Sequence, residues 1–190
     1  MSLKTDAREK RAFTIIEVLV VIAIFSIVMM AVLELYLNFF KTYAIQNATI
    51  NNSYSAGAIL NETENLVHQA NAIVGSKVVS GTSYTTGSTT IILEIPSITS
   101  SGDIVSGKYD YAVMYLASTG IYRVLSSDAA SSRVSGRKLL SEVVNSFSLT
   151  YNSGTPALAT RVIEDIVTQS QVKQQTLQTH LTGTVYLRNH

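Results

Sequence analysis

Apolar residues are concentrated in one run near the amino end of the chain. From Val18 to Leu33 the only polar residue is Ser26. Counted from Phe13, the run has 21 residues. As a helix it would be about 32 Å long, close to the ~30 Å hydrocarbon core of a bilayer. The pattern predicts a membrane-spanning helix over residues 13–40.

Helical spacing continues beyond this apolar run. Apolar residues follow a three-to-four spacing, interrupted at Asn47, at Tyr36, Phe40, Tyr43, Ile50 and Tyr54, and the pattern resumes at Ile59, Leu66, Ala70 and Ile73. The first proline is Pro96, and we expect the helix to stop before Gly75. We therefore expect one helix from residue 13 to about residue 74, roughly 90 Å long, whose amphipathic part, residues 41–75, packs on a sheet.

The remaining chain, residues 76–190, has the pattern of a β-rich domain. Residues 80–90 are Ser, Thr or Gly except for Tyr84, which indicates a loop or a hairpin tip. Residues 160–173 fit a helix or a strand, and the regular spacing of the other strands favours a strand. Short runs predict strands at residues 89–95, 110–116, 121–125, 147–151 and 181–187. The predicted fold class is α+β, with a long amino-terminal α-helix packed on an antiparallel β-sheet.

Basic residues precede the apolar run and predict its orientation. They are Lys4, Arg8, Lys10 and Arg11, and without residues 1–12 the chain has ten basic and eleven acidic residues. Because basic flanks stay in the cytoplasm, we expect a cytoplasmic amino end and a carboxyl domain on the other side of the membrane. A near-neutral domain makes nucleic acid an unlikely partner. The absence of cysteine excludes disulfides, thiolate metal sites and a cysteine nucleophile.

A possible processing site lies before the apolar run rather than after it. A secretory signal has its small-residue cleavage site after the apolar region. Here the candidate junction is Ala12–Phe13, between the basic stretch and the apolar run. Cleavage there would keep the whole helix on the mature protein and leave a free amine at Phe13.

The basic leader, this junction and the sequence FTIIE at residues 13–17, followed by a long apolar helix, resemble the type IV pilins and type II secretion pseudopilins. The resemblance implies a pilin-like fold, with residues 13–40 forming a filament core as well as a membrane span. It also implies that a prepilin peptidase removes leader residues 1–12 and methylates the amine of Phe13. The chain has Ala12 where the family has glycine, and it lacks the proline that many members carry in the helix.

Glu17 is a carboxylate at the start of an apolar helix, where an unpaired charge is costly. A neighbouring subunit's Phe13 amine would neutralise it and fix the register between subunits, because a slip leaves both charges unpaired. We therefore expect Thr14 and Glu17 to be the assembly residues. The alternative is a monomeric anchor in which Glu17 reaches the lipid headgroups.

The carboxyl-terminal sequence HLTGTVYLRN, residues 180–189, resembles the end of J-type minor pseudopilins and related minor pilins. This second resemblance implies a minor subunit. The secretion, pilus and competence machines share the anchor, so the sequence fits all three.

Other candidate chemistry is weak. Residues 102–108 have the spacing of a phosphate-binding loop, but Tyr109 stands where a Ser or Thr is needed. Ser135 and Lys138 match a Ser-x-x-Lys pair without its partner motifs. The three histidines share no ligand spacing, and we expect no metal, cofactor or small-molecule substrate. We expect solvated side chains at Glu62, Glu64, Arg133, Arg137 and Lys138.

The leading interpretation is a structural subunit, not an enzyme, in a pilus-like filament or a type II secretion pseudopilus. Its expected partners are the lipid bilayer, the prepilin peptidase and methyltransferase, and other pilin or pseudopilin subunits. We expect a single-pass protein of the inner (cytoplasmic) membrane with a periplasmic or extracellular domain. Two alternatives are a minor pilin that acts as a binding tip for adhesion or DNA uptake, and a membrane-anchored domain of unrelated function, such as a hydrolase.

Overall fold

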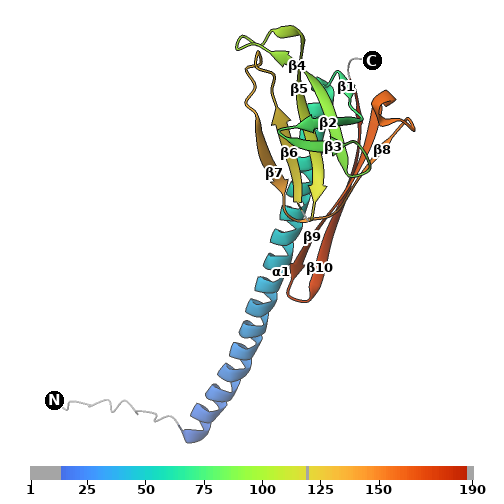
Figure 1. Ribbon diagram of the computed structural model, residues 1–190. Helices are drawn as coiled ribbons and strands as arrows, with labels where there is room; N and C mark the ends of the chain where they lie inside the picture. The colour runs from blue at the N-terminus through green and yellow to red at the C-terminus, as the bar shows by residue number, and fades with distance from the viewer. Residues whose placement is uncertain (1–13, 119, 188–190) are drawn as a thin grey trace, which may run out of the picture. The chain divides into compact units, whose positions relative to one another are not determined.

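The computed structural model describes residues 14–118 and 120–187. One long helix, α1 (Ile15–Gln69), is followed by a β-rich region (Figure 1). The boundary between two compact units lies inside α1, between Ala44 and Ile45.

In the first unit, the apolar side chains of α1 are exposed from Ile15 to Tyr43. Within the described residues, α1 is the one helix long and apolar enough to cross a membrane. Such a continuous apolar surface requires lipid or another protein to cover it.

Helix α1 ends at Gln69, five residues before the predicted end. Strand β1 (Ala72–Ile73) follows and pairs antiparallel with β4 (Thr90–Ile98). The Asn71 N–H donates to Glu94 O at 2.7 Å, and the Val74 N–H donates to Ile92 O at 2.9 Å. Ile73 fits the helical spacing, but its backbone pairs with β4 at the edge of the sheet. Its side chain is therefore buried as part of a strand and not as part of the helix.

Two antiparallel sheets and a separate hairpin form the second unit. The five-stranded sheet has the order β1-β4-β5-β6-β7, and the three-stranded sheet has the order β10-β9-β8. The hairpin pairs β2 (Ser76–Val79) with β3 (Thr82–Thr85), and η1 (Pro156–Leu158) is a short 3-10 helix. The other strands are β5 (Ile104–Ala117), β6 (Gly120–Ser126), β7 (Gly136–Ser141), β8 (Val144–Tyr151), β9 (Arg161–Val172) and β10 (Gln175–Tyr186).

The main core lies between the carboxyl-terminal part of α1 and the two sheets. Alternate side chains of β4 and β9 pack with Ala56 and Ile59 of α1, among them Ile91, Leu93, Val162 and Ile166. A second apolar cluster lies on the other face of the five-stranded sheet, under the β2–β3 hairpin, and contains Val79, Ile92, Val113 and Val124. The hairpin crosses in front of β4 and β5 in Figure 1.

Strand β10 approaches α1 closely at Gly183. A Cβ at this position would overlap Leu60 Cδ1 of the helix, so a larger residue requires the Leu60 side chain to move. Nearby, the Asn52 side-chain amide of α1 donates to Leu177 O of β10 at 3.0 Å, and the Thr168 hydroxyl of β9 donates to Asn52 O at 3.0 Å. These contacts fix the β9–β10 hairpin against the helix.

The predicted α+β fold class, a long helix packed on antiparallel sheets, is confirmed. Each predicted strand run lies within or largely overlaps an observed strand, and the ambiguous residues 160–173 form β9. The polar stretch 80–90 contains the tip of the β2–β3 hairpin, with positive φ at Ser80 and Gly81. Lys108 lies inside β5, so residues 102–108 are not followed by a phosphate-binding helix.

Candidate functional site

The start of α1 is closed by reciprocal hydrogen bonds between Thr14 and Glu17. The Thr14 N–H donates to Glu17 Oε2 at 2.9 Å, and the Glu17 N–H donates to Thr14 Oγ1 at 3.3 Å. Thr14 immediately precedes the first helical residue, so this is a capping box that satisfies two otherwise unpaired backbone donors. The pattern Thr-x-x-Glu could have predicted this cap from the sequence.

The cap uses only one of the two carboxylate oxygens. The Thr14 hydroxyl also donates to Glu17 Oε2, at 3.0 Å. Within the described part of the chain, no donor reaches Glu17 Oε1. Because an ionised carboxylate accepts several hydrogen bonds, this oxygen can accept one from a group outside the helix without breaking the cap.

The surroundings of the cap are apolar. Ile15, Ile16, Val18 and Leu19 are all exposed, and no basic side chain pairs with Glu17 within residues 14–118 and 120–187. The predicted junction at Ala12 and the methylation position Phe13 lie outside the described residues. The structure therefore brings together two of the four predicted site residues, Thr14 and Glu17.

A known motif covers this region of the chain. The prokaryotic N-terminal methylation motif matches residues 7–33, which include Arg8, Lys10 and Arg11 and the apolar run with Glu17. The chain therefore carries the amino-terminal motif of type IV pilin-like proteins. The match supports a pilin or pseudopilin precursor from a structural, non-enzymatic family, and the apolar helix is consistent with a single-pass anchor in the inner membrane. No curated protein and no solved structure is significantly similar to the chain.

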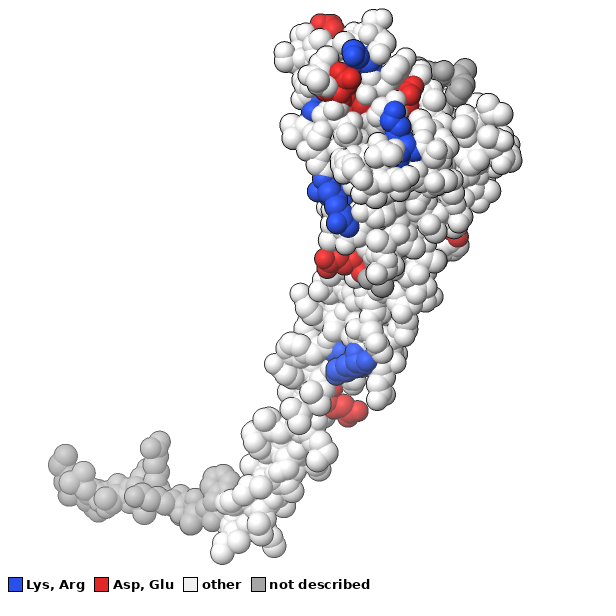
Figure 2. Space-filling view, viewed as in Figure 1, with Lys and Arg blue, Asp and Glu red and all other residues white. Residues whose placement is uncertain are grey.

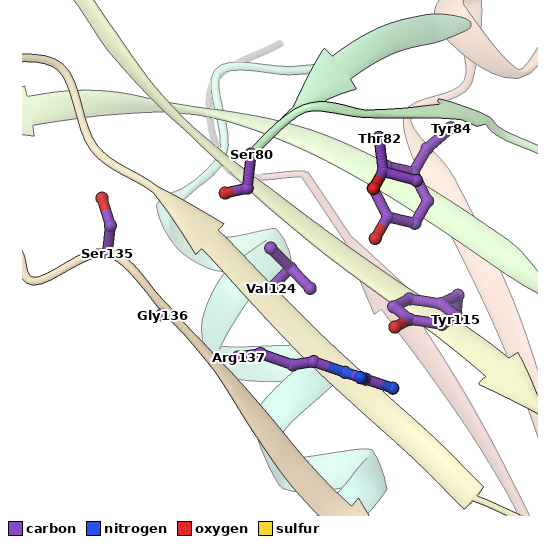
Figure 3. Close-up of a pocket in the computed structure, with 8 residues that line it drawn as sticks. All are labelled: Ser80, Thr82, Tyr84, Tyr115, Val124, Ser135, Gly136 and Arg137. Carbon is purple, nitrogen blue, oxygen red and sulfur yellow. The ribbon is translucent and has the colours of Figure 1, made fainter.

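The chain also has a pocket of about 580 Å³ on the hairpin side of the five-stranded sheet (Figure 3). Tyr84 and Tyr115 lie on one side of it and Arg137 on another. The ring centroids of Tyr84 and Tyr115 are 5.3 Å apart, and the Arg137 guanidinium lies 3.9 Å from the ring centroid of Tyr122. The remaining lining residues are small or hydroxylated, and none is acidic: Ser80, Thr82, Val124, Ser135 and Gly136.

Arg133 is not the solvated side chain that the sequence predicts. Its guanidinium donates to buried Asp110 at 2.8 Å and to Pro96 O at 2.6 Å. Ser97 and Ser131 also donate to Asp110. Burial alone would raise the pKa of Asp110, but these hydrogen bonds outweigh it and hold the pKa below its ordinary value. Asp110 thereby fixes the β6–β7 connection to the sheet.

Glu62 was also predicted to be solvated, and this is wrong. It accepts a hydrogen bond from Arg123 of β6 at 2.6 Å, and both side chains are partly buried. The pair connects α1 to the five-stranded sheet. Glu64, two residues further along, is exposed as expected and lies 3.4 Å from His68.

Glu164 on β9 is a fully buried acid that no sequence pattern above singled out. The Thr63 hydroxyl of α1 donates to its Oε1 at 3.0 Å, while its Oε2 has no hydrogen-bond partner. Burial raises the pKa of Glu164 to about 8, and the bond from Thr63 opposes this only in part. The alternation of β9, which places Glu164 in phase with Val162 and Ile166, could have predicted an inward-facing acid.

The remaining candidate catalytic or metal-binding residues do not form a site. The Ser135 hydroxyl accepts from the Ser127 N–H at 2.9 Å and lies 2.6 Å from the Ser127 hydroxyl. His180 contacts Asp165 on the exposed face of the three-stranded sheet, where the Thr182 hydroxyl donates to Asp165 at 2.8 Å. In residues 14–118 and 120–187, no group of three potential ligands could hold a metal ion.

Proposed function

We propose that the chain is a structural subunit of a pilus-like filament or a secretion pseudopilus. A prepilin peptidase cleaves it between Ala12 and Phe13 and methylates the new amine of Phe13. The single observation that carries this proposal is the methylation motif at residues 7–33, which ends within the long apolar helix. The exposed apolar side chains of Ile15–Tyr43 support it, because lipid can cover them before assembly and neighbouring helices can cover them afterwards.

Glu17 contributes to assembly by pairing with the Phe13 amine of an adjacent subunit. The free Oε1 atom supports this role, since the capping hydrogen bonds go to Oε2. An ammonium paired with this oxygen satisfies a charge that would otherwise be surrounded by apolar side chains. The same contact fixes the position of one subunit along the next.

The amino end is cytoplasmic and the β-rich domain lies beyond the membrane, as the basic residues before the apolar run favour. The sequence HLTGTVYLRN at the carboxyl end supports a minor subunit. Within this sequence, the residues up to Tyr186 belong to β10, and Val185 and Leu187 contribute side chains to the main core.

The test compares cells with and without a prepilin peptidase. We expect the peptidase to shorten the chain by its 12-residue leader and to allow its recovery with sheared filaments or with an overproduced pseudopilus. Without the peptidase, the longer chain stays in the membrane fraction. Equal length and equal filament recovery in both strains would contradict the proposal. An Ala12→Gly variant controls for slow cleavage, because it supplies the residue that the family has at this position.

A second candidate function is a binding tip, which the tyrosine-lined pocket favours. DNA does not suit this surface, because its phosphates need free basic side chains. Arg123 and Arg133 are held in ion pairs, and Arg137 lies over a tyrosine ring. Filter binding of DNA by the full chain in detergent tests whether such a tip binds DNA. We expect weak retention that is unchanged by Arg137→Ala. Tight, steeply salt-dependent binding would favour a role in DNA uptake instead.

A further inference from the structure

Two opposite charges stand alone on the amino-terminal half of α1. Between Glu17 and Glu62 the only charged residues are Glu34 and Lys41. Both are exposed, and neither forms an ion pair in the described part of the chain. The face of this segment shown in Figure 2 is white apart from one acidic and one basic patch.

The spacing of the two residues prevents them from pairing within one chain. They are seven positions apart on a continuous helix, which is close to two turns and about 10 Å along the axis. They therefore lie on the same side of α1, but too far apart for a salt bridge. A second copy displaced along the helix axis brings Glu34 of one copy level with Lys41 of the other.

The surroundings make unpaired charges unfavourable once the helix is covered. Large apolar side chains flank both residues and are exposed, including Tyr36, Leu37, Phe39 and Phe40. The rings of Tyr36 and Phe40 contact each other with centroids 4.5 Å apart. A neighbouring helix that covers this surface also removes water from Glu34 and Lys41, and an isolated charge is then costly unless an opposite charge compensates it.

We propose that Glu34 of one copy forms an ion pair with Lys41 of the adjacent copy. This inference rests on the proposed function, in which copies of the chain pack through this helix. A second copy is the partner because the chain itself supplies both charges at one end of the same apolar surface. The pair is a second register-fixing contact, at the opposite end of the apolar segment from Glu17.

The two contacts require displacement in the same direction. In the Glu17 contact, the amine at residue 13 of one copy meets residue 17 of its neighbour, a displacement of four residues or about 6 Å. In the second contact, residue 34 of that same copy meets residue 41 of the neighbour. Side chains on a helix lean toward its amino end, so the long side chain of Lys41 reaches back and reduces the difference between the two displacements.

A consequence concerns the number of copies. An ion pair between Glu34 and Lys41 needs at least two adjacent copies of this chain. A minor subunit would therefore occur as a short run of copies and not as a solitary tip.

The experiment uses charge reversal in the full chain, expressed in cells that contain the peptidase. Because the chain has no cysteine, Leu35→Cys and Thr42→Cys, seven positions apart beside the two charges, report contact between displaced copies as disulfide-linked multimers. The variants Glu34→Lys and Lys41→Glu should each reduce these multimers at least tenfold. The double variant should restore them to within about threefold of the parent.

Two controls separate register and local charge from other effects. The pair Leu35→Cys and Thr49→Cys lies on nearly the same side of α1 at twice the spacing, and it should give few multimers. Glu64→Lys reverses an exposed charge near the end of the helix and should leave the multimers unchanged. Membrane insertion and the length of the mature chain are measured for every variant.

Several results would overturn the inference. One is that Glu34→Lys and Lys41→Glu each still form the multimers. Another is that the double variant forms no more multimers than either single variant. If the parent chain is cleaved and enters filaments but forms no multimers with itself, its neighbours are other subunits and the inference is wrong. If the parent chain is neither cleaved nor assembled, the proposed function fails as well.

Discussion

The Glu17 side chain has two properties that substitutions can separate: it accepts hydrogen bonds, and it carries a negative charge. Its Oε2 atom closes the capping box with Thr14, a contact within one chain that needs no partner. Its charge has no counterpart among the described residues. Pairing with a neighbouring subunit requires the charge, whereas the cap requires only the acceptor oxygen.

Substitutions at the cap should therefore differ in their effects. Glutamine at the third helical position still completes a capping box, so Glu17→Gln keeps the helix start and removes the charge. We expect it to enter the membrane normally and to reduce incorporation into filaments at least tenfold, as Glu17→Val should. Thr14 contacts Glu17 only through the cap, so its part in assembly is to hold the helix start. Thr14→Val weakens the cap but keeps the charge, and should assemble within a fewfold of the parent.

The measurement is the amount of chain in the filament fraction relative to the membrane fraction. If Glu17→Gln assembles as well as the parent while Glu17→Val does not, the carboxylate acts through the cap alone and charge pairing is refuted.

Glu164 predicts a pH dependence of stability in the β-rich unit. Its pKa is raised to about 8 in the folded chain from an ordinary value of 4.5, so the folded state holds the proton more tightly than the unfolded state. The stabilisation is complete below about pH 4.5 and is lost as the pH rises through 8. At ~1.4 kcal/mol for each pKa unit, the loss is roughly 3–5 kcal/mol.

Glu164→Gln removes the ionisable group and keeps an acceptor for Thr63. The thermal midpoint of the full chain in detergent should fall between pH 5 and pH 9 by clearly more in the parent than in Glu164→Gln. Glu64→Gln, at an exposed position of α1, should behave like the parent. Parallel pH profiles for the parent and Glu164→Gln would show that this acid does not titrate in that range.

At the scale of elements, the contact between α1 and β10 depends on the absence of a side chain at Gly183. Gly183→Ala places a methyl group against Leu60 and should destabilise the unit by about 1–3 kcal/mol, the usual cost of overpacking. Urea unfolding of the parent, Gly183→Ala, Leu60→Ala and the double variant measures the coupling. The double variant should be more stable than the sum of the two single effects predicts. Strict additivity would mean that the helix and the strand do not touch there.

Periodicity predicted the elements better than their ends. The apolar run and its continuation gave α1, and alternation gave the strands, because these patterns reflect the burial of whole faces. The end of α1 was misplaced because Ala72 and Ile73 suit a helix and a strand equally, and pairing with the distant strand β4 decides between them. Turn residues at 80–90 located the β2–β3 hairpin, but not the sheet face that it covers.

The partners of buried charges could not be predicted in the same way. Glu62 meets Arg123 and Asp110 meets Arg133 across long stretches of sequence, and nothing local distinguishes these residues from solvated ones. The capping box is the opposite case, because its two residues are three positions apart and their types alone specify the contact.

At the scale of the whole molecule, two kinds of apolar surface coexist in one chain. The core of the second unit is covered by its own sheets and by its part of α1. Since the chain has no cysteine, packing holds this core together without disulfides. The apolar surface of the first unit is exposed along its length and must be covered from outside. This difference separates a unit that buries its own apolar core from a segment whose apolar surface needs lipid or another protein to cover it.

Mass spectrometry of the amino-terminal peptide of the chain recovered from cells tests the central claim most directly. The account predicts a peptide that begins at Phe13 and carries one additional methyl group on its amine, in a strain with an active prepilin peptidase. A peptide that still begins at Met1 in that strain would contradict it, because no free amine would then exist at residue 13 to pair with Glu17.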